Sequence, residues 1–185
     1  MLIFITGGVR SGKSSFAEKT AMALAKEING QLHYIATGVA SDPEMQERVC
    51  RHQKDRANGP YLWKTWEKPY LVGKLGSKFS KRDILLLDCV TTLLNNEFYL
   101  HEAELDSHVL KGIKDRVLSG IIKLAGCSHS LIVVSNEILF EPCQSPFVLS
   151  YQKLLGELHQ EIVQRADKAY MVEMGIPILM KGDLS

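Results

Sequence analysis

The sequence feature that most constrains the fold is a glycine-rich segment close to the N-terminus. Residues 7–14 read Gly-Gly-Val-Arg-Ser-Gly-Lys-Ser, which matches the pattern G-x-x-x-x-G-K-[ST] in full. An apolar stretch, residues 2–6, directly precedes this segment, and an amphipathic stretch suited to a helix begins near Lys13. Strand, glycine-rich turn and helix in this order predict a loop that binds phosphate through its backbone N–H groups and the helix N-terminus.

All eight residues of this phosphate loop are predicted nucleotide contacts. They are Gly7, Gly8, Val9, Arg10, Ser11, Gly12, Lys13 and Ser14. Lys13 is expected to reach the β and γ phosphates and Ser14 to bind Mg²⁺. A turn that merely joins a strand to a helix requires neither this lysine nor this serine, so we interpret the segment as a site for GTP or ATP.

The rest of the chain alternates between two kinds of segment. Short apolar segments predict five buried parallel strands at residues 2–6, 32–36, 84–88, 131–135 and 169–173. Amphipathic stretches predict helices at residues 13–26, 43–56, near 104–124, and 149–165. This alternation predicts an α/β doubly wound fold, and without a linker or repeat we expect one domain, residues 1–185.

Turn residues complete this outline of the fold. Residues 58–60 and 141–146 are predicted loops, and residues 174–180 predict a turn followed by one more strand. We therefore expect a C-terminal hairpin at the edge of the sheet.

The composition argues against several other classes of protein. The 22 basic and 21 acidic residues nearly cancel, so the charge indicates no nucleic-acid partner. The four cysteines are far apart and form no C-x-x-C pair, which favours reduced thiols in a cytoplasmic protein over a zinc site or disulfides. No apolar run approaches the roughly 18 residues that cross a bilayer, so we expect no membrane span.

An acidic residue ends the third predicted strand. Residues 84–88 read Ile-Leu-Leu-Leu-Asp, and the carboxyl ends of parallel strands meet at one edge of a sheet. The carboxylate of Asp88 is therefore expected near the phosphate loop, where it would orient Mg²⁺ together with Ser14. The alternative is an acid that only ends a strand, and the phosphate loop favours the metal role.

His52 lies in the predicted helix 43–56, one helical turn from both Arg48 and Arg56. An imidazole nitrogen can attack phosphorus and carry the group as a phosphoramidate, while arginines neutralise the phosphate oxygens. The same spacing also fits a solvated surface histidine, and spacing alone does not separate the two. The other histidines lack such a setting and are interpreted as ordinary: His33, His101, His108, His129 and His159.

With these segments in place, the chain resembles the bifunctional adenosylcobinamide kinase and adenosylcobinamide-phosphate guanylyltransferase family of cobalamin biosynthesis over almost its whole length. The resemblance rests on an ordered series of motifs at residues 6–14, 34–37, 48–52 with Arg56, 63–67, 87–92, 135–137, and 166–167 with 175–177. It implies phosphorylation of adenosylcobinamide with GTP or ATP, followed by transfer of GMP from GTP through a guanylyl intermediate on His52.

The resemblance also implies the partners and the remaining site residues. Guanine-nucleotide contacts are expected from Ala36, Thr37, Gly38, Gln53, Lys54, Asp55, Arg56, Glu67 and Asp88. The implied cofactor is Mg²⁺, the implied acceptor is a corrinoid, and the implied fold is a RecA-like, mostly parallel sheet in a homotrimer.

The chain also departs from the pattern of the family it resembles. Residues 138–146 contain no glycine where the family has a G-x-G-[IV]-V-P loop, Gln152 and Lys153 stand where an arginine is expected, and extra residues occur around 58–60. Two alternatives therefore stay open: a kinase in which His52 only binds phosphate, and a GTP-dependent regulatory or scaffold protein.

Overall fold

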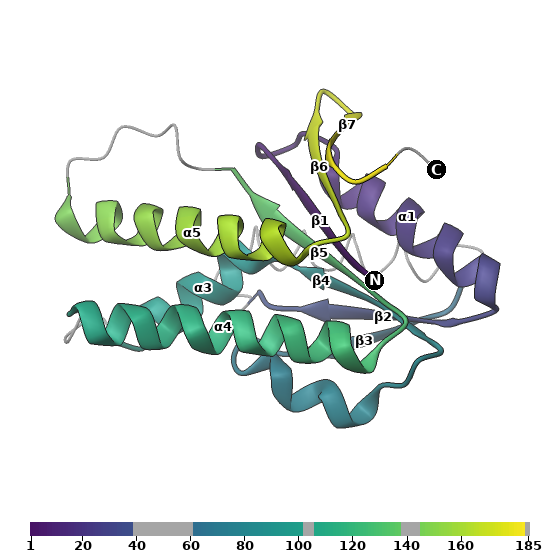
Figure 1. Ribbon diagram of the computed structural model, residues 1–185, viewed down its shortest axis with the longest axis horizontal. Helices are drawn as coiled ribbons and strands as arrows, with labels where there is room; N and C mark the ends of the chain where they lie inside the picture. The colour runs from purple at the N-terminus through teal and green to yellow at the C-terminus, as the bar shows by residue number, and fades with distance from the viewer. Residues whose placement is uncertain (39–60, 102–105, 138–144, 184–185) are drawn as a thin grey trace, which may run out of the picture.

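The computed structural model describes residues 1–38, 61–101, 106–137 and 145–183 of the 185-residue chain. Within these residues seven strands form one sheet in the order β3-β2-β4-β5-β1-β6-β7 (Figure 1). All neighbouring strands are parallel except β6 and β7, which form an antiparallel hairpin. The strands are β1 (Leu2–Gly7), β2 (Gln31–Ala36), β3 (Trp63–Glu67), β4 (Asp83–Asp88), β5 (Ser130–Asn136), β6 (Lys168–Glu173) and β7 (Ile176–Lys181).

Helices cover the sheet on both faces (Figure 1). The helix α1 (Lys13–Ile28) packs on one face, while α3 (Val90–Tyr99), α4 (Ser107–Cys127) and α5 (Pro146–Arg165) lie on the other. The 3-10 helix η1 (Val72–Lys78) packs beside α4. Because strand side chains alternate between faces, Ile3 and Ile5 contribute to the core under α1, whereas Leu2 and Phe4 contribute to the core under α5.

The helix α1 packs close to the sheet because its buried face is made of small residues. Ala17, Ala21 and Ala25 recur every four residues and are at most 3% exposed. This spacing places all three on one side of the helix, and their small side chains let the helix backbone approach the strands. The first turn of α1 is thereby held against the carboxyl edge of the sheet.

Most predicted elements are confirmed, with boundaries one to three residues longer than the sequence indicated, and the C-terminal hairpin forms as expected. One strand assignment and one loop assignment are wrong. Five strands were expected to make the sheet besides the hairpin strand, but β3 also joins it as the edge strand beside β2. Pro146, assigned to a loop, is the first residue of α5, where its missing N–H costs no hydrogen bond. The predicted helix 43–56 and loop 58–60 lie outside the described residues.

Two helical segments, α3 and η1, were not predicted, and the start of α4 was placed too early. The helix near residues 104–124 begins at Ser107, because the carboxylate of Asp106 accepts the backbone N–H groups of His108 and Val109, each at 2.8 Å. Among the described residues, no helix combines the length and apolarity needed to cross a membrane.

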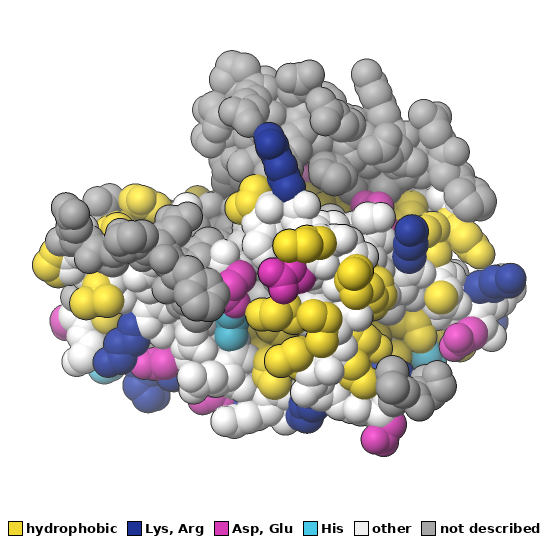
Figure 2. Space-filling view, turned by 90° about the horizontal axis from the view of Figure 1, so that it is seen from above, with side chains coloured by type: hydrophobic (Ala, Val, Ile, Leu, Met, Phe, Trp, Pro, Cys, Tyr) yellow, Lys and Arg dark blue, Asp and Glu magenta, His cyan; other side chains and the backbone are white. Residues whose placement is uncertain are grey.

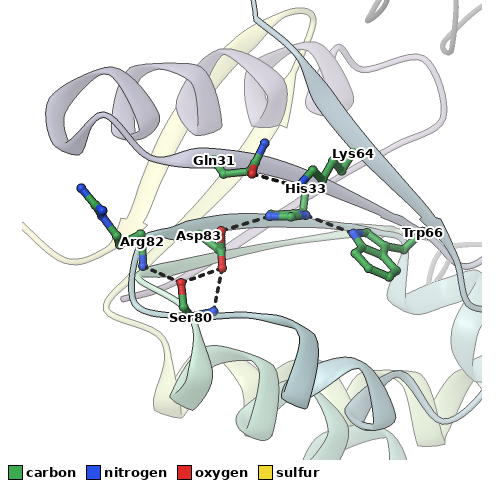
Figure 3. Close-up of polar contacts among 7 residues, drawn as sticks. All are labelled: Gln31, His33, Lys64, Trp66, Ser80, Arg82 and Asp83. Atoms are coloured by element: carbon green, nitrogen blue, oxygen red, sulfur yellow. Dashed lines mark hydrogen bonds and ion pairs between the residues drawn. The ribbon is translucent and has the colours of Figure 1, made fainter.

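A buried histidine fastens the edge strand β3 to the rest of the sheet (Figure 3). His33 of β2 is 3% exposed, and its Nδ1 accepts the indole N–H of Trp66 of β3 at 3.0 Å. Its Nε2 must therefore carry the proton, which it donates to the carboxylate of Asp83 of β4 at 3.1 Å. Burial lowers the pKa of His33, although the hydrogen bond and charge of Asp83 act in the opposite direction, so the ring is neutral. This network fixes the strand that ends at Glu67.

Candidate nucleotide site

The phosphate loop connects β1 to α1 at the carboxyl edge of the sheet, and its backbone needs glycine at defined places. Gly12 has φ of 93°, in the left-handed region that glycine adopts most easily. A Cβ on Gly7 would lie 2.3 Å from the carbonyl oxygen of Val172, so no side chain fits there. Arg10 also has a positive φ, 61°, which places a strained non-glycine residue inside the loop.

The N-terminus of α1 is left open for an anion. Its N-cap residue is Gly12, which supplies no side-chain hydrogen bond, and its first turn contains no acidic residue. The free N–H groups of a helix N-terminus carry a partial positive charge. A phosphate is the kind of group that satisfies them, and the loop directs them to one place.

Lys13, the first residue of α1, is 5% exposed. Its ammonium Nζ donates a hydrogen bond to the carbonyl oxygen of Gly8 at 3.0 Å, so the side chain curls back across the loop. Ser14 follows it and is partly exposed. The side-chain oxygen of Ser11 is buried and has no hydrogen-bond partner within the described part of the chain. The loop and the first turn of α1 therefore carry an ammonium, two hydroxyl groups and backbone donors.

Asp88 stands at the same edge and on the same face of the sheet as α1. Tyr34, whose side chain belongs to the core under α1, donates its hydroxyl to Oδ2 of Asp88 at 2.9 Å. The register pairs Ala36 with both Asp88 and Glu67, and paired residues of parallel strands point to the same face. Glu67, Ala36 and Asp88 therefore form one row across three strands.

Asp88 lies at the same edge as the phosphate loop, and one strand separates β4 from β1. β5 lies between β4 and β1 in the sheet, so Asp88 lies two strand spacings, about 10 Å, from β1. The hydroxyl of Ser14 and the carboxylate of Asp88 are hard oxygen donors of the kind that Mg²⁺ prefers. Magnesium usually takes only one or two carboxylates and completes its coordination with phosphates and water, so these two groups fit it.

Thr37 differs from its neighbours in being fully buried. Its hydroxyl accepts the N–H of Cys89 and donates to the carbonyl oxygen of Cys89, both at 2.8 Å. Its own N–H donates to the carbonyl of Asp88, and its carbonyl accepts the amide of Asn96. These bonds tie the ends of β2 and β4 together, and they place Ala36 and Gly38 at the edge.

The predicted carrier of the nucleotidyl group lies outside the described residues. This carrier is His52. Four of the expected guanine-nucleotide contacts also lie outside the described residues, namely Gln53, Lys54, Asp55 and Arg56. Gly38 is the last described residue before this segment, and Tyr61 is the first after it. The described chain thus leaves the sheet at the carboxyl end of β2, on the nucleotide edge, and resumes just before the amino end of β3.

The opposite face of the sheet carries an apolar groove of about 350 Å³ between α5 and the hairpin β6–β7. Its lining includes Thr6, Glu137, His159, Val163, Met171 and Met180. Figure 2 shows hydrophobic side chains gathered around this hairpin. Because its surface is mainly apolar and offers no cation among the residues that line it, we place the nucleotide on the α1 face instead.

Two polar residues with contacts distant in the chain were not identified from the sequence. Asn96 binds the carbonyls of Thr37 and Pro69, which are 59 and 27 residues away in the chain. His159, interpreted as ordinary, is buried, and its Nε2 lies 2.7 Å from the hydroxyl of Ser135. Burial lowers the pKa of His159 to about 4, so this ring is neutral at pH 7. Contacts this distant in the chain leave no local pattern from which to predict them.

Comparison with known proteins identifies the family to which the chain belongs. The sequence model of the family described as "Cobinamide kinase / cobinamide phosphate guanyltransferase" matches residues 3–180. The chain is 35% identical over 181 residues to the "Bifunctional adenosylcobalamin biosynthesis protein CobP" of Pseudomonas aeruginosa, covering 97% of this chain and 96% of that protein. It is 28% identical over 189 residues to the CobU protein of Escherichia coli with the same description, covering 98% and 100% of the two chains.

Solved structures show the fold alone, at 15% identity. The flagellar accessory protein FlaH from Methanocaldococcus jannaschii aligns with a TM-score of 0.52, covering 98% of this chain and 78% of that chain. A second solved structure, an ATPase domain, aligns with a TM-score of 0.53, covering 92% and 68%. Fold, phosphate loop and nearly full-length sequence similarity thus agree, and the chain belongs to the cobinamide kinase / cobinamide phosphate guanyltransferase family.

Proposed function

We propose that this protein phosphorylates adenosylcobinamide and then converts the product to adenosylcobinamide-GDP, using GTP or ATP in the first step and GTP in the second. The observation that carries the proposal is the complete phosphate loop, with buried Lys13 and an open helix N-terminus, in a chain matched by the family from residue 3 to residue 180. The acceptor of the phosphoryl group is the aminopropanol hydroxyl of the corrinoid.

In the kinase step the hydroxyl oxygen of the substrate attacks the γ-phosphorus in line and loses its proton, and the bond to the β-γ bridging oxygen breaks so that GDP or ADP leaves. The ammonium of Lys13 and the N–H groups of the loop would stabilise negative charge on the transferred group. Ser14 and Asp88 would hold Mg²⁺, which supplies further neutralisation of phosphate charge.

In the transferase step an imidazole nitrogen of His52 attacks the α-phosphorus of GTP and expels pyrophosphate. The resulting phosphoramidate is then attacked by a phosphate oxygen of adenosylcobinamide phosphate, which takes GMP and returns the histidine to its neutral form. The histidine lies outside the described residues, so its role rests on the family. Expected nucleotide contacts are Ala36, Gly38, Glu67 and Asp88, and Thr37 would act by holding the ends of β2 and β4 together.

The same family likeness supports a homotrimer in the cytoplasm. Light scattering on the purified protein would measure the number of subunits in the oligomer. The two free cysteines among the described residues agree with a reducing compartment. Burial and the charge of Asp88 raise the pKa of Cys89, so its thiol stays protonated and unreactive.

The decisive experiment labels the covalent intermediate. The protein is incubated with Mg²⁺ and GTP carrying radioactive phosphorus at the α position, then denatured and tested for acid-labile, alkali-stable label. We expect label on the wild type and none on His52→Ala. Wild-type protein that binds GTP and phosphorylates cobinamide without becoming labelled would be a kinase alone, whereas binding without turnover would indicate a regulatory protein.

A further inference from the structure

The turn of the C-terminal hairpin packs directly on the phosphate loop. Both lie at the top of Figure 1, although more than 160 residues separate them in the chain. The N–H of Gly175, in the turn between β6 and β7, donates to the carbonyl oxygen of Ser11 at 2.8 Å. A Cβ on Gly12 would lie only 3.1 Å from the Cα of Gly175, so the two backbones are in close contact.

This hydrogen bond fixes the direction of a donor on the other side of the loop. The carbonyl of Ser11 and the N–H of Gly12 belong to the same planar peptide unit, and in a trans unit they point in opposite directions. Because the hairpin holds the carbonyl toward itself, the N–H of Gly12 is directed away from the hairpin, into the loop where phosphate binds. Rotation of this unit would instead present the carbonyl oxygen to the phosphate, which repels it.

A second anchor acts in the same way at the start of the loop. The N–H of Glu137, just after β5, donates to the carbonyl oxygen of Gly7 at 3.0 Å. The N–H of Gly8, in the same peptide unit as that carbonyl, is therefore turned the opposite way. Both anchors come from outside the loop and leave amide groups oriented for an anion, as in a backbone nest.

We propose that Gly175 is a positioning residue for nucleotide binding, which acts by holding the peptide unit between Ser11 and Gly12 in its anion-binding orientation. The inference rests on the proposed function only in requiring that the loop binds nucleotide phosphates. It gives a role to Gly175, the first of the residues 175–177 that the sequence singles out but the reaction steps do not use. The C-terminal hairpin is then part of the nucleotide site as well as the edge of the sheet.

The geometry of the turn provides a matched pair of variants. Met174 and Gly175 have φ of 50° and 81°, as the two central residues of a tight hairpin turn require. A Cβ on Gly175 meets nothing within 4 Å, so a side chain there is limited by backbone conformation and not by space. Asparagine tolerates the left-handed region, whereas the β-branched valine of similar size does not.

The test measures binding of Mg-GTP by calorimetry to the full-length wild type, Gly175→Asn and Gly175→Val, with circular dichroism and thermal unfolding of each free protein. We expect Gly175→Val to bind about tenfold more weakly and Gly175→Asn to stay within about twofold of the wild type. Comparing each variant's change in affinity with its change in unfolding temperature separates a positioning role from a structural one. A merely structural role lowers the unfolding temperature and leaves the affinity of the folded protein unchanged.

Folded Gly175→Val that binds Mg-GTP as tightly as the wild type would overturn the inference and leave the proposed function intact. Failure of the wild type to bind either GTP or ATP would instead contradict the proposed function. If Gly175→Val does not fold, amide hydrogen exchange on the wild type decides. Saturating Mg-GTP should slow exchange at the N–H of Gly175, because coupling between two sites is reciprocal, and an unchanged rate would refute the proposal.

Discussion

The phosphate loop and the His33 network each place a basic side chain inside the protein, but they surround it with different groups. Lys13 is 5% exposed and His33 is 3% exposed. The ammonium of Lys13 lies within a loop of backbone groups and donates to the carbonyl of Gly8. The ring of His33 is enclosed by side chains, with a carboxylate on one nitrogen and an indole on the other.

The difference follows from what each base can do when it is buried. Imidazole becomes neutral when burial lowers its pKa, so His33 is accommodated by two hydrogen bonds that saturate both nitrogens. An ammonium has three donors and a high pKa, and burying it is costly unless groups of opposite charge compensate it. The histidine site thus consists of side chains that saturate both ring nitrogens, whereas Lys13 lies in a loop of the kind that binds an anionic ligand.

Removing Lys13 should produce the largest effect, on function and not on folding. For Lys13→Ala we expect the rate of cobinamide phosphorylation to fall on the order of 10²–10³-fold, since one preorganised donor to the transferred phosphoryl group is lost. Steady-state kinase assays measure this change. Lys26→Ala, an exposed lysine in the last turn of the same helix, is the matched control. A loss below about tenfold would show that the loop does not use Lys13 in this way.

The neutral histidines should appear in the dependence of stability on pH. The pKa of His159 is about 4 in the folded protein and near 6.5 when unfolding exposes the ring. Between these values the unfolded state binds more protons, so the free energy of unfolding falls as pH falls from about 6.5 to 4, by roughly 3 kcal/mol for His159. His33, whose pKa is also lowered, acts in the same direction.

Urea unfolding at pH 7 and pH 4.5 measures this loss, with each variant compared with the wild type so that other titrating groups cancel. His159→Gln should lose less stability than the wild type on acidification, whereas His108→Gln, at an exposed position, should behave like the wild type. Equal acid sensitivity of His159→Gln and the wild type would mean that the ring is not held neutral in the fold.

The difference between the phosphate loop and the His33 network also explains which of the two could be predicted from the sequence. The phosphate loop depends on backbone angles and on a helix start, which require glycines and a lysine at fixed local spacing, so it was found from residues 7–14. The strands with continuous apolar runs were found for a similar reason. The His33 network joins three strands, and its partners Trp66 and Asp83 are 33 and 50 residues away, so no local pattern records it.

The missed elements follow the same physical rule. The edge strand β3 has exposed Lys64 and Thr65 beside half-buried tryptophans, so it lacks the apolar run by which the central strands were recognised. The helix α3 begins with Val90 and Thr91, β-branched residues of low helix propensity, and it owes its stability to the burial of Leu94 and Phe98. That burial depends on α4 and α5, which the local sequence does not contain.

The smallest predicted effect tests whether the hydrogen bond between Trp66 and His33 contributes to stability as its geometry indicates. Trp66→Phe keeps an aromatic ring against Phe79 but removes the indole N–H, which leaves the buried Nδ1 of His33 without a donor. We expect a loss of about 1 to 2 kcal/mol in the free energy of unfolding at pH 7, measured with urea.

A control for this change lies on the same strand. Trp63→Phe alters the same kind of side chain, but within the described residues the indole of Trp63 makes no hydrogen bond, so only its packing against Tyr34 changes. The loss of stability in Trp66→Phe beyond that in Trp63→Phe should become smaller as pH falls. Protonation of Nδ1 of His33 at low pH also breaks the bond to Trp66 in the wild type. A constant excess at all pH values would mean that the loss comes from packing, and that the tautomer of His33 is not what secures the edge strand.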